Sequence, residues 1–479
     1  MPTTSTHKVI GRTYLTMAVG IIIAGVAVGL YPQILYSSLP EIPSDLPEPK
    51  RSINVSSLAS LTAAIDSAMP GDQIVLKNGE YFTTELIQIS AKGTAENPIV
   101  ITAETLEGAE IGGSYGFYLA SSENVIVKGF RLTHSQDSSE DANRCHDCVN
   151  VRFTANVFAL TTQTDNASDW LAITGTSSGV RVDNNTFQNK STMGNFLILV
   201  GEEGRMVQNT RVDHNVFSYH TYDGPNGGEC IEVGNSSLGP IPANALIEHN
   251  LFDNCNGDAE ALSIKSSQNT IRYNTFKNSY GSLVLRHGSE NVVDGNVFVG
   301  GYSGIRAYGA NHLIANNYLA STSGYPIVVG RATVPADIAA SNAEYSQAKN
   351  IVIAHNTLAN NEAGIVVGAY EGSFMPANIT VANNIVTSIS GVLIQVMDGD
   401  VVFVNNILYP TGTATVGDIP TGGYIKLDPL LQGSEKIMRP TAESPAIDAV
   451  SKEEAYGVTT DMDGQVRNGL FDIGAEELV

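Results

Sequence analysis

Basic side chains are scarce in this chain of 479 residues. Lys and Arg together number 26 against 49 Asp and Glu, so the formal net charge at pH 7 is 26 − 49 = −23. A negative field of this size repels DNA and RNA, because nucleic-acid binding depends on Lys and Arg that neutralise phosphates. The sequence therefore predicts no nucleic-acid partner.

Charged residues and tryptophan are also few. Only 16% of the residues are charged, whereas 42% are hydrophobic. This composition is too apolar for a disordered acidic chain and is sufficient for a large core. A single Trp beside 46 Gly favours a turn-rich β architecture over a helical bundle. Length does not fix the number of domains, because single all-β domains often exceed roughly 150 residues.

One long apolar run lies near the N-terminus. Residues 14–30 are almost continuously apolar and follow the basic residues Lys8 and Arg12. Basic residues before such a run keep the N-terminus in the cytoplasm, so we expect the rest of the chain to be extracytoplasmic: periplasmic, secreted or anchored at a bacterial membrane. The length fits a cleaved signal peptide or a membrane anchor equally well, and we assign one of these to residues 1–36. A proline-rich linker follows over residues 37–51.

One octapeptide pattern recurs ten times between residues 151 and 408. It alternates apolar residues, has Asn at its sixth place and usually Phe or Leu at its eighth. The asparagines are Asn156, Asn185, Asn215, Asn250, Asn274, Asn296, Asn317, Asn356, Asn384 and Asn406. Separations of 21 to 39 residues are typical of a solenoid of short strands in which some turns carry loops. The sequence predicts an all-β fold, a single-stranded right-handed parallel β-helix that occupies residues 52–479.

The recurring residues have physical roles in such a solenoid. The Asn amide can bond the backbone at a turn and tolerates left-handed geometry, and stacked copies form an asparagine ladder between coils. The residue two places later points to the same side and is expected inside. A helix predicted over residues 61–69 would cap the N-terminal end, and the tail after Ser444 is expected to cover the other end.

The four cysteines give weaker information. Cys145 and Cys148 have no second pair nearby, which argues against a zinc site. Cys230 and Cys255, 25 residues apart, fit either a disulfide between adjacent coils or two buried thiols. An exported protein permits the disulfide.

The ladder can be used as a ruler for polar residues. Asn226, Glu260, Arg286 and Arg306 lie 10 to 12 residues after the nearest preceding ladder Asn, so all four are expected on one lateral sheet. Asp258 shares the face of Glu260, because strand side chains alternate. Lys265 lies five residues after Glu260, an odd number. We therefore expect a bend between Glu260 and Lys265 if both face one groove.

These residues combine two kinds of chemistry. An Asn oxygen and two carboxylates, from Asn226, Asp258 and Glu260, form a hard-oxygen site suited to Ca²⁺. Lys265 and Arg286 add positive charge beside it. Between residues 258 and 331 there are six Lys or Arg and four Asp or Glu, a local charge of +2, while the rest of the chain carries −25. This pattern indicates a cationic groove for an anionic partner within an acidic protein.

At these motifs the chain resembles the family six polysaccharide lyases, which include alginate lyases and the dermatan-sulfate lyase chondroitinase B. The matching runs are Asn226-Gly-Gly-Glu229, Asp258-Ala-Glu260 with Lys265, Leu285-Arg286-His287-Gly288 and Gly304-Ile305-Arg306. The family places its catalytic Arg 21 residues after its catalytic Lys, and here 286 − 265 = 21. The resemblance spans residues 52 to 479. One departure is Asp258, where the family usually has Glu.

The resemblance implies β-elimination at a uronic-acid residue. Ca²⁺ held by Asn226, Asp258 and Glu260 would neutralise the sugar carboxylate. Lys265, as a neutral amine, would abstract the C5 proton, and we expect Ca²⁺ and Arg286 to lower its pKa. Arg286 takes the acid role at the leaving oxygen. The substrate-binding candidates of the motifs and of the next coil are Glu229, His287, Arg306 and His312.

The predicted partner is an anionic polysaccharide, most simply alginate, with dermatan sulfate as the closest alternative. A β-helical glycoside hydrolase would instead use a carboxylate pair such as Asp258 and Glu260. A carbohydrate-binding β-helix without activity is the third possibility. A membrane is expected to be contacted only through the N-terminal segment, and the sequence makes no prediction of oligomeric state.

Overall fold

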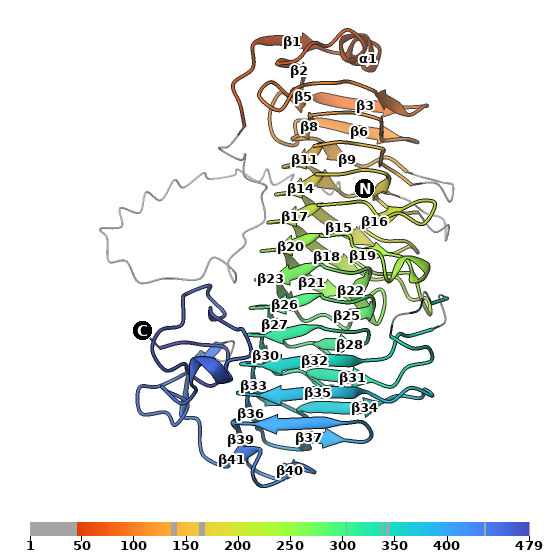
Figure 1. Ribbon diagram of the computed structural model, residues 1–479. Helices are drawn as coiled ribbons and strands as arrows, with labels where there is room; N and C mark the ends of the chain where they lie inside the picture. The colour runs from red at the N-terminus through yellow and green to blue at the C-terminus, as the bar shows by residue number, and fades with distance from the viewer. Residues whose placement is uncertain are drawn as a thin grey trace, which may run out of the picture.

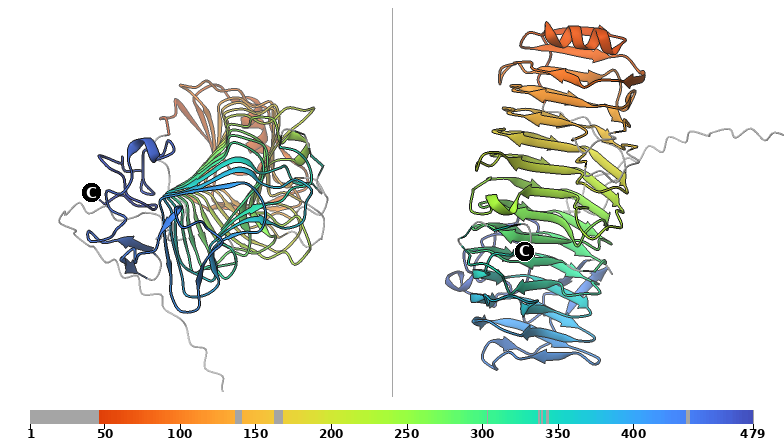
Figure 2. Two further views of the ribbon diagram at one scale, coloured as in Figure 1. Left: turned by 60° about the horizontal axis from the view of Figure 1, so that its bottom comes forward. Right: turned by 90° about the vertical axis from the view of Figure 1, so that its right-hand side faces the viewer.

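The fold is a parallel β-helix, as predicted. The computed structural model describes residues 46–135, 141–161, 168–302, 304–336, 338, 340–341, 344–434 and 437–478. Its coils stack from α1 at one end to β40 and β41 at the other, and three long sheets form its sides (Figures 1 and 2). No helix in this part of the chain is long and apolar enough to span a membrane. The predicted signal peptide or anchor and most of the predicted linker lie outside the described residues.

Each coil contributes one strand to each sheet, in the order first, third, second. The first sheet contains Arg51–Val55 (β1), Asp72–Leu76 (β2), Ile99–Ala103 (β5), Val125–Lys128 (β8), Arg152–Thr154 (β11), Arg181–Asp183 (β14), Arg211–Asp213 (β17), Leu246–Glu248 (β20), Thr270–Arg272 (β23), Val292–Asp294 (β26), Leu313–Ala315 (β29), Lys349–Ala354 (β32), Ala377–Ala382 (β35) and Val401–Val404 (β38). The second sheet contains Ile87–Ile89 (β4), Phe117–Ala120 (β7), Arg144–His146 (β10), Leu171–Gly175 (β13), Leu197–Gly201 (β16), Ile231–Gly234 (β19), Glu260–Lys265 (β22), Ser282–His287 (β25), Ile305–Ala307 (β28), Ile327–Gly330 (β31), Ile365–Ala369 (β34), Val392–Val396 (β37) and Thr415–Gly417 (β40). The third sheet contains Gly79–Thr83 (β3), Ala109–Gly113 (β6), Arg131–Leu132 (β9), Val157–Phe158 (β12), Thr186–Lys190 (β15), Val216–His220 (β18), Leu251–Cys255 (β21), Thr275–Lys277 (β24), Val297–Val299 (β27), Tyr318–Ala320 (β30), Thr357–Asn361 (β33), Ile385–Ser388 (β36), Asn406–Pro410 (β39) and Tyr424–Ile425 (β41).

A helix closes the N-terminal end, three residues earlier than predicted. Helix α1 spans Leu58–Asp66 and lies across the end of the stack (Figure 2). It begins there because Ser57 caps it: the Ser57 hydroxyl accepts a hydrogen bond from the Ser60 N–H, and the Ser60 hydroxyl accepts one from the Ser57 N–H. Leu61 and Ile65 are buried against the first coil. The prediction of a helical cap is confirmed and its boundaries were wrong.

The asparagine ladder is continuous. From Asn156 to Asn406 each side-chain Nδ2 donates to the Oδ1 of the next ladder residue, over 2.9–3.0 Å. The left-handed residue of each turn is the one before the ladder Asn, such as Ala155 at φ 53° and Tyr273 at φ 54°. The amides therefore satisfy buried backbone groups at the turn between the first and third sheets.

The aromatic residues two places after the ladder Asn form a stack inside the solenoid. Successive ring centroids lie 4.3–5.2 Å apart. The stack consists of Phe158, Phe187, Phe217, Phe252, Phe276 and Phe298. All are almost fully buried, so the prediction of a core role is confirmed.

The first sheet carries ion pairs between neighbouring coils. Asp213, fully buried, lies 2.8 Å from Arg181, 3.1 Å from Arg211 and 2.8 Å from His214. Burial alone would raise the pKa of Asp213, but hydrogen bonds from His214 and Arg181 and the nearby arginine charges hold it below its ordinary value. Asp213 therefore remains ionised in the folded protein.

The C-terminal segment packs along the side of the solenoid (Figure 1). This corrects the prediction that it covers the far end. Met462 and Ala475 pack on Val297, Tyr318 and Ala320, which belong to the third sheet. The physical reason is that these strands present apolar side chains outward as well as inward, so this flank requires a cover. The segment also contains a hairpin of Leu431–Ser434 (β42) and Ile437–Pro440 (β43).

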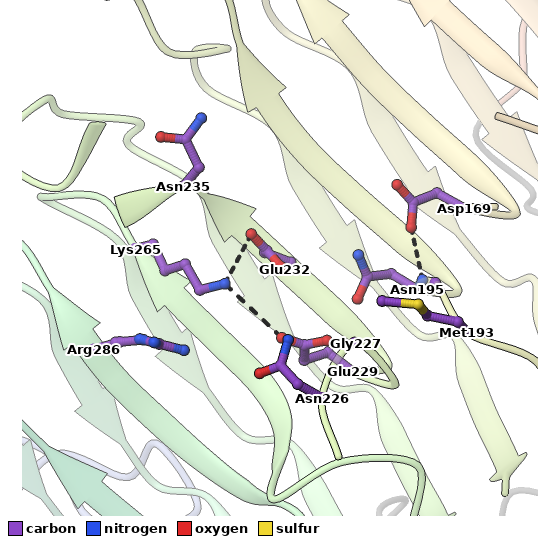
Figure 3. A pocket seen from close by; sticks show the side chains of 11 residues that line it. Asp169, Met193, Asn195, Asn226, Gly227, Glu229, Glu232, Asn235, Lys265 and Arg286 are labelled. Atoms are coloured by element: carbon purple, nitrogen blue, oxygen red, sulfur yellow. Dashed lines mark hydrogen bonds and ion pairs between the residues drawn. The ribbon is translucent and has the colours of Figure 1, made fainter. Parts of the chain in front are cut away.

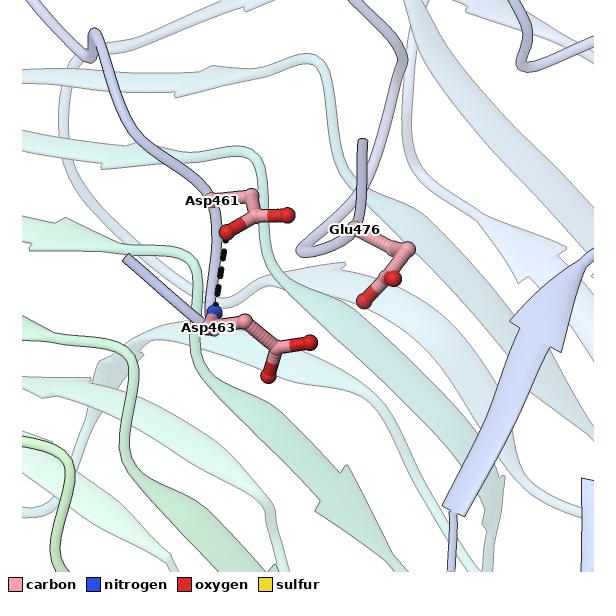
Figure 4. A group of neighbouring side chains, drawn as sticks. All are labelled: Asp461, Asp463 and Glu476. Atoms are coloured by element: carbon pink, nitrogen blue, oxygen red, sulfur yellow. Dashed lines mark hydrogen bonds between the residues drawn. The ribbon is translucent and has the colours of Figure 1, made fainter. Parts of the chain in front are cut away.

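Three carboxylates gather within the C-terminal segment. Asp461, Asp463 and Glu476 converge in Figure 4, with one oxygen of each within 4.8 Å of the others. Arg439 forms ion pairs with Asp463 and Glu476. Burial and the adjacent Glu477 raise the pKa of Glu476 to about 8. The group therefore has a cationic partner from the chain itself, and it fastens the segment to its own hairpin.

The four cysteines form two disulfides, a point that the sequence left open. Cys145 bonds to Cys148 within one coil. Cys230 bonds to Cys255 across neighbouring coils. The second bond ties the strand that begins at Ile231 to the turn that contains Asp258.

Candidate active site

The predicted site residues lie on adjacent strands of the second sheet. Glu260 and Lys265 belong to β22, Arg286 to β25 and Arg306 to β28, and these strands are consecutive neighbours. Asn226 precedes β19, and Asp258 lies in the turn that leads into β22. The prediction that one lateral sheet carries these residues is therefore confirmed for Glu260, Arg286 and Arg306. It was wrong for Asn226, which lies in a bend between β18 and β19.

One register irregularity in β22 explains how Glu260 and Lys265 come to face the same side. In the pairing with β25, Glu260 lies opposite Ser282 and Leu262 opposite Leu283, so Ala261 is an extra residue in β22. An extra residue of this kind changes the side to which the following strand residues point. The expected bend is thus present at Ala261. A second irregularity lies in β25, where Arg286 is the extra residue between the partners of Ile264 and Lys265.

A cavity of about 260 Å³ opens at the end of the Lys265 side chain (Figure 3). Its wall includes the predicted residues Asn226, Glu229, Lys265 and Arg286. It also includes Glu232, which the motif search did not select. The cavity therefore combines carboxylate, amide and cationic side chains in a small space.

The amine of Lys265 is held between two carboxylates. Its Nζ lies 2.9 Å from Glu232 Oε1 and 3.9 Å from Glu229 Oε1 (Figure 3). Burial lowers the pKa of Lys265, but the charges of Glu232 and Glu229 and the hydrogen bond that the amine donates to Glu232 outweigh it and hold the pKa above its ordinary value. The expectation that its surroundings lower this pKa was wrong for the protein without a bound cation, because neighbouring carboxylates outweigh Arg286.

The two carboxyl groups differ in their contact with the amine. Burial, followed by the charge of Glu232, raises the pKa of Glu229 to about 8. Burial also raises the pKa of Glu232, and the charge of Lys265 and the hydrogen bond that it donates oppose this rise. Of the two groups, Glu232 lies within hydrogen-bond distance of the amine and forms the ion pair with it.

The carboxylates of Asp258 and Glu260 lie beside this group. Asp258 accepts hydrogen bonds from the Gly227 N–H, at 2.8 Å, and from the Glu260 N–H, at 3.2 Å. Glu260 Oε1 lies 2.6 Å from Arg306 and 3.6 Å from Arg286. Because Gly227 follows Asn226 directly, these contacts bring together the segments that carry the three predicted metal ligands.

The residues present fit a hard divalent cation. Asn226 offers an amide oxygen, and Asp258 and Glu260 offer carboxylates, the donors that calcium prefers. Burial and the charge of Glu260 raise the pKa of Asp258, and both carboxylates add to the raised pKa of Glu229. Such mutual repulsion is relieved when a cation binds between the carboxylates.

An aromatic side chain from a loop covers the two arginines. The ring of Tyr345 lies 4.6 Å from the Arg286 guanidinium and 5.9 Å from that of Arg306. Tyr345 lies between β31 and β32, in a connection that has no repeat pattern, so the sequence offered no signal for it. Glu232 was detectable in principle, because it lies three residues after Glu229 in the same motif region.

Two of the predicted substrate contacts are buried in the structure. His312 is 2% exposed, with Nδ1 accepting from the Asn291 N–H and Nε2 2.8 Å from the Tyr308 carbonyl. His287 is 1% exposed and lies 2.9 Å from the Ser346 hydroxyl. Both are enclosed in the protein wall, where His312 supports a turn and His287 supports the loop that carries Tyr345.

The remaining two predicted substrate contacts are Glu229 and Arg306. Glu229 lines the cavity. Arg306 lies in β28, one coil beyond Arg286, next to Glu260 and Tyr345.

Comparisons with known proteins agree with this geometry. The sequence model of the Chondroitinase B family matches residues 55–418. The solved structure of the PL6 family alginate lyase AlyGC is 26% identical, with a TM-score of 0.72 over 88% of this chain and 57% of AlyGC. A mannuronic acid specific family 6 lyase from human gut microbiota is 24% identical, with a TM-score of 0.66 over 75% of this chain and 86% of that one. No curated protein matches the chain.

The chain spans a little over half of AlyGC. The residues that the family model matches, 55–418, include the coils that carry Lys265 and Arg286. These matches leave no support for a glycoside hydrolase or for a binding protein without activity. The chain belongs to the chondroitinase B family, within polysaccharide lyase family six, and is a polysaccharide lyase.

Proposed function

We propose that the protein is an alginate lyase that uses calcium-assisted β-elimination. The observation that carries the proposal is the single cavity in which the Lys265 amine and the Arg286 side chain meet Asn226 and the neighbouring carboxylates. Support for alginate comes from the similarity to AlyGC, a PL6 family alginate lyase. The local charge of +2 between residues 258 and 331 favours a polyuronate in this groove.

The reaction removes a proton next to a carboxylate, which resists carbanion formation. Asn226, Asp258 and Glu260 would hold calcium, which would supply positive charge against this carboxylate. Lys265, as the free amine, takes the C5 proton while the C4–C5 double bond forms and the C4–O bond breaks. Arg286 stabilises the developing charge and assists protonation of the leaving oxygen. Arg306 binds the carboxylate of an adjoining sugar through its planar fork.

The test is incubation of the soluble domain with alginate and, separately, with dermatan sulfate. The unsaturated uronate that a lyase forms absorbs in the near ultraviolet, and we expect this signal to rise with alginate. A chelator should abolish the rise and added calcium should restore it. Absence of product from both polymers would contradict the proposal.

Dermatan sulfate is the second candidate, because the matching family model is that of chondroitinase B. A signal confined to dermatan sulfate would transfer the proposal to that substrate. Undiminished product formation after thorough chelation would remove calcium from the mechanism.

Export of the chain is part of the same proposal, since its polymeric substrate lies outside the cell. The support is the apolar run at residues 14–30 that follows Lys8 and Arg12. N-terminal sequencing of protein recovered from the medium, the periplasm and the membrane fraction tests it. A mature protein beginning after residue 30 indicates a cleaved signal, an intact membrane-bound chain indicates an anchor, and intact chain in the cytoplasm contradicts export.

A further inference from the structure

Among the described residues, Glu232 is the charged neighbour closest to the Lys265 amine. Its Oε1 lies 2.9 Å from Lys265 Nζ, within the range of a charge-assisted hydrogen bond. The contact is built into the sheet, because β19 and β22 are adjacent strands in which Glu232 pairs with Ser263 and Gly234 with Lys265. Only 13% of the Glu232 side chain is exposed. The carboxylate therefore meets the amine inside the cavity wall, away from bulk water.

The wider surroundings of the amine carry more negative than positive charge. The carboxyl groups of Glu229, Glu232 and Glu260 act electrostatically on the Lys265 amine, and Asp169 acts on Glu232. The Arg286 guanidinium lines the same cavity. His287 is adjacent in sequence to Arg286, and burial lowers its pKa to about 3, so it is neutral. An ammonium is therefore the stable form of Lys265 in the free protein, whereas a base must offer a lone pair.

We propose that Glu232 is a positioning residue that holds the Lys265 amine in the cavity and accepts the proton that the amine must lose before it acts. The inference rests on the proposed role of Lys265 as the base. In the step, one N–H bond of the ammonium breaks and an O–H bond forms on Glu232. The lone pair of the resulting amine then takes the C5 proton of the sugar. After both transfers, Lys265 and Glu232 together hold one proton more than before, and this proton passes to the leaving oxygen or to water.

The geometry selects Glu232 over Glu229 for this role. Glu229 lies 3.9 Å from the amine, beyond hydrogen-bond distance, and Glu232 lies at 2.9 Å. Glu229 also carries a proton at neutral pH, because burial and Glu232 raise its pKa to about 8. A group that is already protonated cannot accept a second proton from Lys265. A low-dielectric site penalises the charged forms, so it reduces the free-energy cost of converting the ion pair of Glu232 and Lys265 into its neutral form.

The test compares Glu232→Gln and Glu232→Asp with the unaltered protein on alginate, with calcium present. Glu232→Gln keeps an acceptor for the amine and loses the proton-accepting carboxylate. We expect kcat at neutral pH to fall by about tenfold or more with KM within about twofold, and the loss to shrink as the pH rises and Lys265 deprotonates without help. Glu232→Asp should recover part of the neutral-pH activity.

A second readout does not depend on turnover. The extent of Lys265 acylation by an amine-directed reagent, followed by peptide mass spectrometry across pH, reports where the amine becomes neutral. Its midpoint should move to lower pH in Glu232→Gln, by roughly one unit or more, because a neighbouring negative charge is lost. Glu123→Gln is the matched control, since Glu123 pairs with Lys92 across neighbouring coils away from the site. That variant should leave both readouts unchanged.

The outcomes separate this inference from the proposed function. An unchanged kcat in Glu232→Gln, or a loss that is equal at every pH with an unmoved acylation midpoint, overturns the role of Glu232. If Lys265→Ala is inactive in the same assay, the proposed function survives that result. Full activity of Lys265→Ala would instead overturn the base on which the inference rests. Should Glu232→Gln fail to fold, the acylation midpoint of the Glu232→Asp variant decides, because an unshifted midpoint contradicts the proposed contact.

Discussion

Replacement of Asn274 by Ala should destabilise the solenoid strongly. Asn274 is fully buried, and its Nδ2 donates to the carbonyls of Ile247 and Arg272 and to Asn296 Oδ1. Its Oδ1 accepts from the backbone N–H and the side chain of Asn250. The substitution leaves that N–H without its ladder acceptor, at a cost of about 1–3 kcal/mol, and removes further bonds worth about 0.5–1.5 kcal/mol each. We expect the free energy of unfolding to fall by about 3–5 kcal/mol.

The assay is urea unfolding followed by far-ultraviolet circular dichroism. Asn468→Ala serves as the control, because Asn468 is an exposed Asn outside the ladder whose side chain bonds only the nearby Val466 carbonyl. The control should change the free energy of unfolding by less than about 0.5 kcal/mol. Equal small effects of both substitutions would refute the view that the ladder satisfies buried backbone groups.

Three further perturbations test separate parts of the structure. Arg306→Ala should raise KM for alginate by about tenfold or more, since hydrogen bonds to charged groups contribute about 1.5–3 kcal/mol; an unchanged KM in initial-rate measurements would remove Arg306 from substrate binding. Because the pKa of Asp213 is lowered in the folded protein, its ionised form contributes stability above the unfolded pKa near 4, and this stability is lost as the pH falls below that value. Asp213→Asn should therefore flatten the acid side of a plot of melting temperature against pH. An unaltered slope would contradict this. Paired substitution of Cys230 and Cys255 by Ala should lower the free energy of unfolding by about 3–4 kcal/mol, from the closure of a loop of 25 residues, and chemical denaturation that shows no loss would argue against the bond.

The fold was accessible from sequence because its strongest signal is local and repeated. Each octapeptide contains its own turn residues, its ladder Asn and its core residue. Ten copies together predict one architecture, the parallel β-helix. The boundaries of α1 were missed because they depend on the paired Ser57 and Ser60 hydroxyls. The place of the C-terminal segment was missed because it depends on packing against outward-facing apolar residues such as Val297 and Tyr318. The repeat pattern does not reveal this contact.

The site was accessible in part for the same reason. Counting from the ladder placed Glu260, Arg286 and Arg306 on one sheet, but it could not show that Arg306 would bind Glu260 directly. The protonation of Lys265 depends on contacts between coils, and Glu232 reaches it from the preceding strand. Such contacts between residues 33 positions apart have no signature in a single sequence.

The burial of the two histidines was also beyond the sequence. It depends on a turn at Tyr308 and on a loop at Ser346 that the repeat does not encode. The motifs and the next coil made His287 and His312 candidates, and the packing around them encloses both side chains.

The central claim is that Lys265 performs proton abstraction in a lyase groove. Its most direct test is the initial rate of unsaturated uronate formation from alginate by Lys265→Ala beside Lys277→Ala. Lys277 is a half-exposed lysine that pairs with Asp253 on the third sheet. We predict that Lys265→Ala keeps its circular dichroism spectrum and loses activity by about a thousandfold, within the range expected for a missing general base. Lys277→Ala should retain its activity. Equal activity of the two variants would contradict the claim.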